Sequence, residues 1–266
     1  MTNLVPSPER KVLFAIEGGI ARITFNQLPF NTIDLEAIDQ LADAADQCAA
    51  AAGLRVVVLT GSGDRAFCAG GDVRAFALDP EGVDRLVRDM ASRLHTAISR
   101  LAWLPAPVVA AVNGVAAGAG LSLVAACDLA IASSRATFTS AYTRIGLSPD
   151  GSSSWFLPRL IGRRRAMHMY MNNPVLDAAT ALDWGLLNEV VAPEDFEAAV
   201  ESQVRRLADG PTGAYAGVKE LLMQSGDSLE SQMERETRTI ARLSRSPDGM
   251  EGVRAFIEKR SAQYQG

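Results

Sequence analysis

The chain has 266 residues, of which 48% are hydrophobic and 21% are charged, so it is long enough to enclose a substantial core. Its 31 acidic residues outnumber its 26 basic residues and give a net charge of −5. This balance argues against non-specific binding to nucleic acid, because that binding needs a net basic face.

The first half of the chain alternates between strand and helix patterns. It opens with β-type runs at 12–17 and 21–25 around Gly18 and Gly19, which is typical of a hairpin. We next expect a helix at 35–51, a buried strand at 55–60, a helix at 83–104 and a buried strand at 107–112. A helix that begins soon after Gly114 and a strand at 128–133 follow. This alternation predicts a largely parallel sheet covered by helices.

The second half is nearly all helical from about residue 163. The expected helices lie at 163–171, 178–184, 193–208, 212–223, 229–243 and 248–260. The chain has no repeat of fixed period and no linker rich in proline, glycine or serine. We therefore predict one α/β core at 1–200 and a helical C-terminal region at 201–266 that packs on the core and on neighbouring subunits.

Targeting and metal signals are weak in this chain. Residues 1–14 lack the charged start and apolar run of a signal peptide, and no stretch approaches the roughly 18–20 uninterrupted apolar residues of a membrane helix. The three cysteines are odd in number, and they have no metal-ligand spacing with the two histidines. We expect a cytoplasmic protein with no membrane partner, no nucleic-acid partner, no metal and no disulfide.

Two glycine-bearing segments carry the strongest chemical signal. In the first, residues 65–73, small side chains at 69–71 let the backbone approach a ligand, and an exposed amide near a helix start can donate to an oxygen that gains negative charge. In the second, residues 107–123, a buried strand again leads through glycines into a helix. Two donors are what an oxyanion hole needs, although a tight turn and close helix packing explain the same glycines.

Together these segments resemble the enoyl-CoA hydratase/isomerase (crotonase) superfamily. The resemblance rests on residues 67–73, 112–120 and 127–128, and it extends from residues 30–32 to 251–260. It implies an α/β fold, a crotonase-like spiral of ββα units with a helical C-terminal trimerisation region. It also implies an acyl-CoA thioester substrate, whose CoA serves as the handle, and no cofactor.

Carried over by position, the resemblance assigns the oxyanion donors to the N–H groups of Gly71 and Ala119, with Ala69 beside the bound thioester. Many relatives have glycine in place of Ala119, but alanine keeps the N–H. Asp72 opens the following turn, and Arg74 is the basic residue that reaches the CoA phosphates. Lys259 supplies a second basic group from a neighbouring helix or subunit. A solvated surface role also explains Arg74 and Lys259.

Departures from the hydratases bear on the reaction. Hydratases of this family use two glutamates to position and deliver water, and Ser122 and Tyr142 stand at those two positions here. Neither side chain is a general base near neutral pH, since serine is a weak acid and tyrosine has a reference pKa of about 10. We therefore do not expect two-glutamate hydration.

One carboxylate remains as a candidate acid/base, that of Asp150. Several double-bond isomerases of the superfamily have aspartate there, including ring-opening isomerases of phenylacetate breakdown, which residues 149–159 resemble in particular. The predicted reaction moves a C=C bond of an enoyl-CoA through an enolate, with Tyr142 shaping the pocket or hydrogen-bonding the carboxylate. An aspartate after proline is also a common helix N-cap, which is the structural alternative.

Two other functions stay open. Aryl-CoA dehalogenases resemble the chain in an aspartate at Asp150, an aromatic residue at Tyr142 and a histidine at His95, which would give a covalent ester hydrolysed by water that His95 activates. A lone histidine on a helix is, however, more often a partly exposed residue with no chemical role. The second alternative is a non-catalytic acyl-CoA binder that has lost its glutamates.

Apolar segments at 160–171 and 182–191, taken as helices, would be hard to hide in one subunit. The family assembles trimers or dimers of trimers through such helices, so we expect a homotrimer or hexamer.

Overall fold

The computed structural model describes residues 10–226 and 228–266. Its strands are β1 (Val12–Glu17), β2 (Ile20–Phe25), β3 (Val56–Gly61), β4 (Ala66–Cys68), β5 (Val108–Val112), β6 (Val115–Ala117), β7 (Leu129–Ser133), β8 (Thr137–Thr139), β9 (Leu176–Asp177) and β10 (Glu189–Val191). Its helices are α1 (Leu35–Ala50), α2 (Arg74–Leu78), α3 (Val83–Trp103), α4 (Ala119–Ala126), the 3₁₀ helix η1 (Tyr142–Ile145), α5 (Ser153–Ile161), α6 (Arg163–Asn172), α7 (Ala178–Trp184), α8 (Phe196–Ala208), α9 (Thr212–Met223), α10 (Leu229–Ser244) and α11 (Pro247–Glu258).

The strands form two sheets. The larger sheet has the order β1-β2-β3-β5-β7-β10, and every pair in it is parallel except the β1–β2 hairpin. The smaller sheet has the order β4-β6-β8-β9, with β8 and β9 antiparallel. The predicted α/β class with a largely parallel sheet is therefore confirmed.

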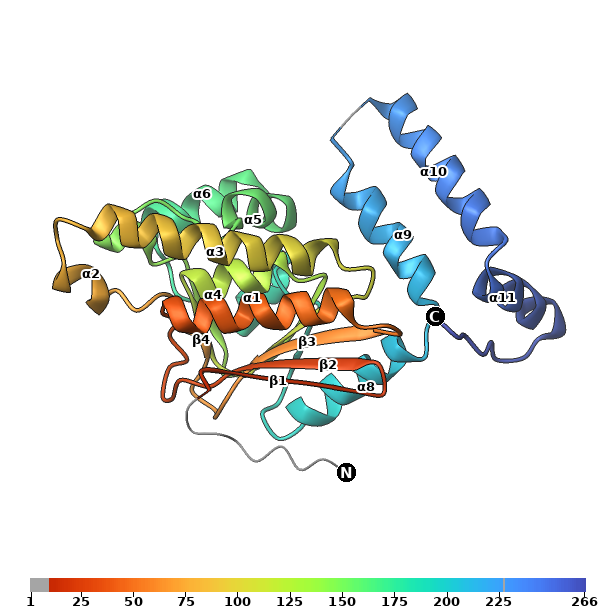
Figure 1. Ribbon diagram of the computed structural model, residues 1–266, viewed down its shortest axis with the longest axis horizontal. Coiled ribbons are helices and arrows are strands. Elements are labelled where there is room, and N and C mark those ends of the chain that lie inside the picture. The colour runs from red at the N-terminus through yellow and green to blue at the C-terminus, as the bar shows by residue number, and fades with distance from the viewer. Residues whose placement is uncertain (1–9, 227) are drawn as a thin grey trace.

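Both faces of the larger sheet are buried, which explains the continuous apolar runs of its central strands. Along β3, Val57 and Leu59 join the core under α1 and α3, whereas Val56 and Val58 pack against Val204 and its neighbours on α8. Figure 1 shows α1 and α3 on one side of the sheet and α8 on the other. Alternate residues of one strand thus serve two hydrophobic layers.

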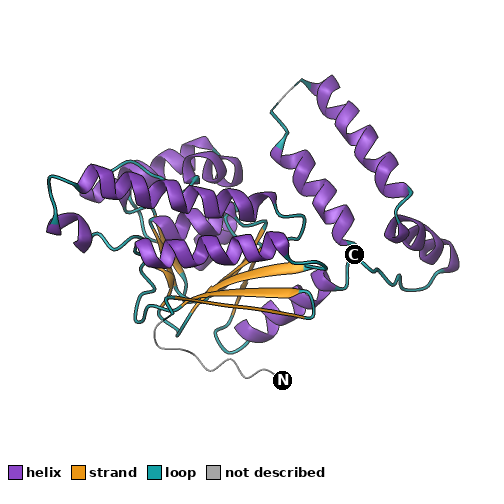
Figure 2. Cartoon of the chain, viewed as in Figure 1, coloured by secondary structure: helices purple, strands orange, loops and turns teal. Residues whose placement is uncertain are grey.

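Helices α9, α10 and α11 form an arm that stands away from the sheets (Figures 1 and 2). Its base is fixed by polar contacts: Arg55 donates from Nε to the Ala208 carbonyl at 2.8 Å, and Lys219 on α9 pairs with Asp128 at 2.6 Å. Large apolar side chains further out are exposed, among them Ile240 at 70% and Phe256 at 85%. The domain division at residue 200 and the assembly state remain predictions.

Two sequence-based expectations about the elements are wrong. The chain after Gly114 first forms strand β6, and α4 begins only at Ala119, because Ala66 and Cys68 of β4 offer β6 a partner. Segment 182–191 is not a helix: α7 ends at Trp184, Gly185 takes a left-handed conformation (φ +89°), and β10 pairs with β7. A short apolar run fits a buried strand and a buried helix equally well, so its period does not decide between them.

Candidate active site

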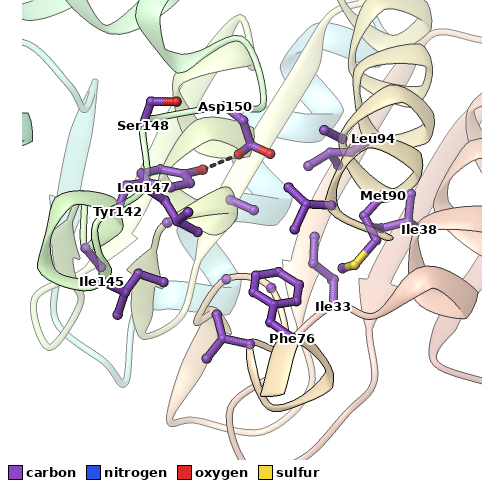
Figure 3. A pocket seen from close by; sticks show the side chains of 18 of the residues that line it. Ile33, Ile38, Phe76, Met90, Leu94, Tyr142, Ile145, Leu147, Ser148 and Asp150 are labelled. Carbon is purple, nitrogen blue, oxygen red and sulfur yellow. Dashed lines mark hydrogen bonds between the residues drawn. The ribbon is translucent and has the colours of Figure 1, made fainter. Parts of the chain in front are cut away.

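A cavity of about 360 Å³ lies between α1, α2 and α3 on one side and the segments that follow β4, β6 and β8 on the other, and its walls are mainly apolar. Figure 3 shows Asp150 and Tyr142 at one end of it and Phe76 at the other. Met90 and Leu94, one turn apart on α3, supply part of the wall between them. Met90 and Leu94 were not identified from the sequence. Their i, i+4 spacing on the buried face of α3 was the available signal.

The loops before α2 and α4 meet beside this cavity. A Cβ built on Gly70 (φ +100°) would lie 3.0 Å from the Ala117 carbonyl oxygen and 3.7 Å from the Ala119 nitrogen. One built on Gly118 (φ +53°) would lie 3.7 Å from the Gly70 Cα. The structure therefore brings together the two segments that carry Gly71 and Ala119, and both of these residues line the cavity, as does Ala69.

Backbone pairing leaves the two amides available. Ile33 donates to the Gly70 carbonyl at 2.9 Å and accepts from the Asp72 N–H at 2.9 Å, so the Gly71 N–H between them is not used. Ala119 is the first residue of α4, where an N–H has no intrahelical partner. Within the described part of the chain, neither N–H donates to a protein acceptor. Ala119 also has no positive φ, so its backbone accommodates the Cβ that distinguishes it from glycine.

Asp150 is the carboxylate among the residues that line the cavity. The Tyr142 hydroxyl donates to its Oδ1 at 2.6 Å (Figure 3). Ser122, which is fully buried, lies 3.1 Å from the same Tyr142 hydroxyl and donates to the Asp150 carbonyl at 3.0 Å. The N-cap of α5 is Ser152, so the interpretation of Asp150 as a helix cap is wrong.

Electrostatics fix the direction of the Tyr142 hydrogen bond. Burial, followed by the neighbouring Asp150 carboxylate, raises the pKa of Tyr142 far above its usual value. The phenol thus keeps its proton and donates it to Asp150. The two positions at which hydratases carry glutamates therefore hold hydroxyl groups that contact the aspartate.

His95 on α3 is exposed and does not line the cavity, but it touches the Asp150 turn. Its Nε2 accepts a hydrogen bond from the Gly151 N–H at 3.1 Å. Nε2 can accept this bond only in the tautomer that has its ring proton on Nδ1.

The candidate CoA-binding residues lie apart from one another. Asp72 and Arg74 form an ion pair at 2.8 Å beside the cavity, the Arg74 side chain is 83% exposed, and this hydrogen bond lowers the pKa of Asp72. Lys259 ends α11, at the opposite end of the molecule from α2 (Figure 1). One chain therefore does not bring Lys259 to the cavity, and its predicted role requires a neighbouring subunit.

Two further surveys of the described residues concern other classes of function. In the ranges 10–226 and 228–266, no cluster of histidine, cysteine, aspartate and glutamate has a geometry that could hold a metal ion. The same ranges contain no helix with the length and apolar character needed to cross a membrane.

The sequence profile of the enoyl-CoA hydratase/isomerase family matches residues 15–266. This chain belongs to that family. Among curated family members, it is 37% identical to the 1,2-epoxyphenylacetyl-CoA isomerase of Escherichia coli K12, over 96% of this chain and 98% of the relative. It is 38% identical to 4-chlorobenzoyl coenzyme A dehalogenase-1 of an Arthrobacter species, over 76% of this chain and 74% of the relative.

Solved structures agree with this family assignment. The crystal structure of an enoyl-CoA hydratase/isomerase from Mycobacterium abscessus superposes with a TM-score of 0.89 at 35% identity, covering 95% of this chain and 98% of that one. The crotonase fold of this chain is thereby established. Family members carry out several reactions on this fold, so the reaction has to be argued from the site.

Proposed function

We propose that the chain is an enoyl-CoA isomerase that moves a C=C bond through an enolate, with Asp150 as both base and acid. The observation that carries the proposal is the position of Asp150, whose carboxylate lines an apolar cavity that the Gly71 and Ala119 amides also line. A single carboxylate suits isomerisation, because the proton removed from one carbon returns to another. Two-carboxylate hydration is not part of this proposal, since Ser122 and Tyr142 stand where the hydratases carry their two glutamates.

The proposed chemistry begins at the thioester carbonyl. Its oxygen accepts from the N–H groups of Gly71 and Ala119, which stabilise the negative charge that develops there. Asp150 takes a proton from a carbon α or γ to the carbonyl. The C–H electron pair moves into the conjugated system and gives the enolate. The protonated Asp150 then delivers the proton to the other carbon, the electron pair returns, and the double bond has moved.

Binding and specificity are assigned in the same proposal. Arg74 beside the cavity contacts the CoA phosphates, and Lys259 of a neighbouring subunit adds a second cation in a homotrimer or hexamer. The mostly apolar wall that includes Phe76 and Met90 accepts an apolar acyl group. The name of the Escherichia coli relative supports including ring-bearing acyl groups among the candidates.

The test is a panel of straight-chain 3-enoyl-CoA, dienoyl-CoA and aryl-CoA thioesters, assayed in deuterated water. The proposal expects at least one member to isomerise, with deuterium entering its carbon chain in the turnovers in which the protonated Asp150 exchanges its proton with solvent before delivery. Turnover of no enoyl-CoA, together with retained CoA binding, would instead establish a non-catalytic binder.

A nucleophilic enzyme is the second candidate, because the chain is 38% identical to a dehalogenase and its His95 contacts the backbone N–H of Gly151, the residue after Asp150. In that reaction an Asp150 carboxylate oxygen attacks the aryl carbon, the halide leaves with the electron pair of the carbon–halogen bond, and water then hydrolyses the aryl ester to free Asp150. The contact that weighs against it is the one between His95 Nε2 and the Gly151 N–H, since it uses the nitrogen that would have to activate water. Oxygen-18 from solvent found in Asp150 after turnover would favour the nucleophile.

A further inference from the structure

The peptide unit between Asp150 and Gly151 is held at both of its polar ends. Its carbonyl accepts from the Ser122 hydroxyl at 3.0 Å and from the Ser153 hydroxyl at 3.0 Å. Its N–H donates to His95 Nε2 at 3.1 Å. The contacts come from α4, α5 and α3, so three helices fix one peptide plane.

The backbone at Gly151 needs such support. Gly151 has φ +60°, and a Cβ built on it would lie 2.8 Å from the Cβ of Ser122. The next residue, Ser152, also has a positive φ of +63°. Two consecutive left-handed residues are uncommon, particularly when one is not glycine, and they persist only where neighbouring groups stabilise them.

Of the three side chains that hold this peptide unit, His95 is the one with no evident role in packing. Its side chain is exposed and lies outside the cavity, whereas Ser122 and Ser153 are buried and Ser153 begins α5. Among the described residues, the Gly151 N–H finds its acceptor on a side chain and not on a backbone carbonyl. The His95 imidazole supplies that acceptor through Nε2.

From this geometry we infer that His95 is a positioning residue, which holds the Asp150–Gly151 peptide and so sets the place of the Asp150 carboxylate relative to the Gly71 and Ala119 amides. This inference rests on the proposed isomerase function. It assigns His95 no proton transfer and no contact with substrate. A displacement of a base by about 1 Å can cost a factor of about 100 in rate, so a remote contact of this kind is measurable.

The test compares three variants with the parent protein. His95→Leu removes the acceptor, His95→Gln keeps an acceptor on a side chain of similar reach, and Ser99→Leu is the control one turn along the exposed side of α3. For His95→Leu we expect kcat to fall about 10- to 100-fold with KM within twofold, because the base moves but the CoA site does not. His95→Gln should recover most of kcat, and Ser99→Leu should match the parent.

Amide hydrogen exchange at Gly151 separates this inference from the proposed reaction. Exchange should accelerate in His95→Leu and return towards the parent rate in His95→Gln, whether or not the protein turns over an enoyl-CoA. Unchanged exchange in His95→Leu would overturn the positioning role even if the isomerase activity is found. If exchange at Gly151 accelerates in His95→Leu but the parent turns over no enoyl-CoA, His95 still holds the Asp150–Gly151 turn, and the proposed isomerase reaction is overturned. If His95→Leu and His95→Gln lose kcat equally, and oxygen-18 from solvent is found in Asp150, the role of His95 is to activate water and the positioning role is overturned.

Discussion

Asp150 has two carboxylate oxygens with different surroundings. Oδ1 accepts the short hydrogen bond from Tyr142, whereas Oδ2 has no protein partner within residues 10–226 and 228–266. The free oxygen is therefore the one that can exchange a proton with a substrate in the cavity. Tyr142 holds the other oxygen and fixes the rotation of the carboxylate.

Replacing Tyr142 by phenylalanine tests this assignment. A hydrogen bond to a charged group contributes about 1.5–3 kcal/mol, so we expect Tyr142→Phe to lower kcat about 10- to 100-fold with little change in KM. Steady-state kinetics on the enoyl-CoA that the parent turns over supply the measurement. Tyr264→Phe in the C-terminal tail is the matched control and should leave kcat and KM unchanged. If Tyr142→Phe has the parent kcat, the hydrogen bond from Tyr142 does not contribute to catalysis by Asp150.

At the scale of elements, the oxyanion amides depend on how closely α4 packs against β4. A Cβ built on Gly120 would lie 1.9 Å from the Cys68 carbonyl oxygen, which is backbone and cannot move aside. Glycine at this position therefore allows α4 to begin beside the loop that carries Gly71. The chemistry of the site is thus linked to a packing contact that no substrate touches.

Gly120→Ala should accordingly affect stability and activity together. Overpacking of this kind costs about 1–3 kcal/mol, and moving α4 also displaces the Ala119 N–H. We expect a lower midpoint of thermal unfolding and a reduced kcat. Gly226→Ala, whose Cβ would meet nothing within 4 Å, is the control for the alanine itself. If both variants have the parent's unfolding midpoint and kcat, the close packing of α4 against β4 does not position the Ala119 N–H for catalysis.

The elements show what could be read from the sequence. The long helices were predictable because their periodicity spans many residues, and the central strands because their continuous apolar runs suit a strand that is buried on both faces. The glycine segments predicted where Gly71 and Ala119 would meet, because close backbone approach needs small residues. Strands β4 and β6 were not predictable, since each has three residues and exists only through pairing with a distant partner.

The candidate site divides in the same way. The resemblance to the family implied that Asp150 is the acid/base in the absence of the two glutamates, and that Tyr142 shapes the pocket or hydrogen-bonds the carboxylate. The contact between His95 and the Gly151 N–H joins residues 56 positions apart through a backbone group, which no side-chain pattern reports. The distance of Lys259 from the cavity was also beyond the sequence, because it depends on how the arm of α9, α10 and α11 leaves the core.

For the whole molecule, the buried cysteines report on the integrity of the core. Burial raises the pKa of Cys48 to about 11 and that of Cys68 to about 12, whereas an unfolded thiol titrates near about 8.5. Only the thiolate reacts with iodoacetamide, so neither should label in the native protein between pH 7 and 9. Labelling should appear on unfolding and quicken as the pH rises towards 8.5. Mass spectrometry of native and denatured samples checks this, and rapid native labelling of Cys68 would contradict the packing.

The arm carries the prediction about assembly. Phe256 on α11 is 85% exposed, and burying such a side chain between subunits stabilises the assembly by about 1.5–3 kcal/mol. We expect the parent to run as a trimer or hexamer in size-exclusion chromatography with light scattering, and Phe256→Glu to shift towards monomer. Glu230→Lys, an exposed charge change on α10, is the comparison. A monomeric parent would contradict both the assembly and the proposed use of Lys259.

The most direct measurement of the central claim is isomerisation by Asp150→Asn in deuterated water, beside the parent enzyme and with CoA-thioester binding measured in parallel. Asparagine keeps the shape of the side chain but cannot take the proton, and general acid–base catalysis contributes about 10²- to 10⁴-fold. We expect Asp150→Asn to bind the thioester with the parent affinity, to lose turnover by that factor and to incorporate no deuterium into the acyl chain. Isomerisation and deuterium incorporation by Asp150→Asn at the parent rate would contradict it.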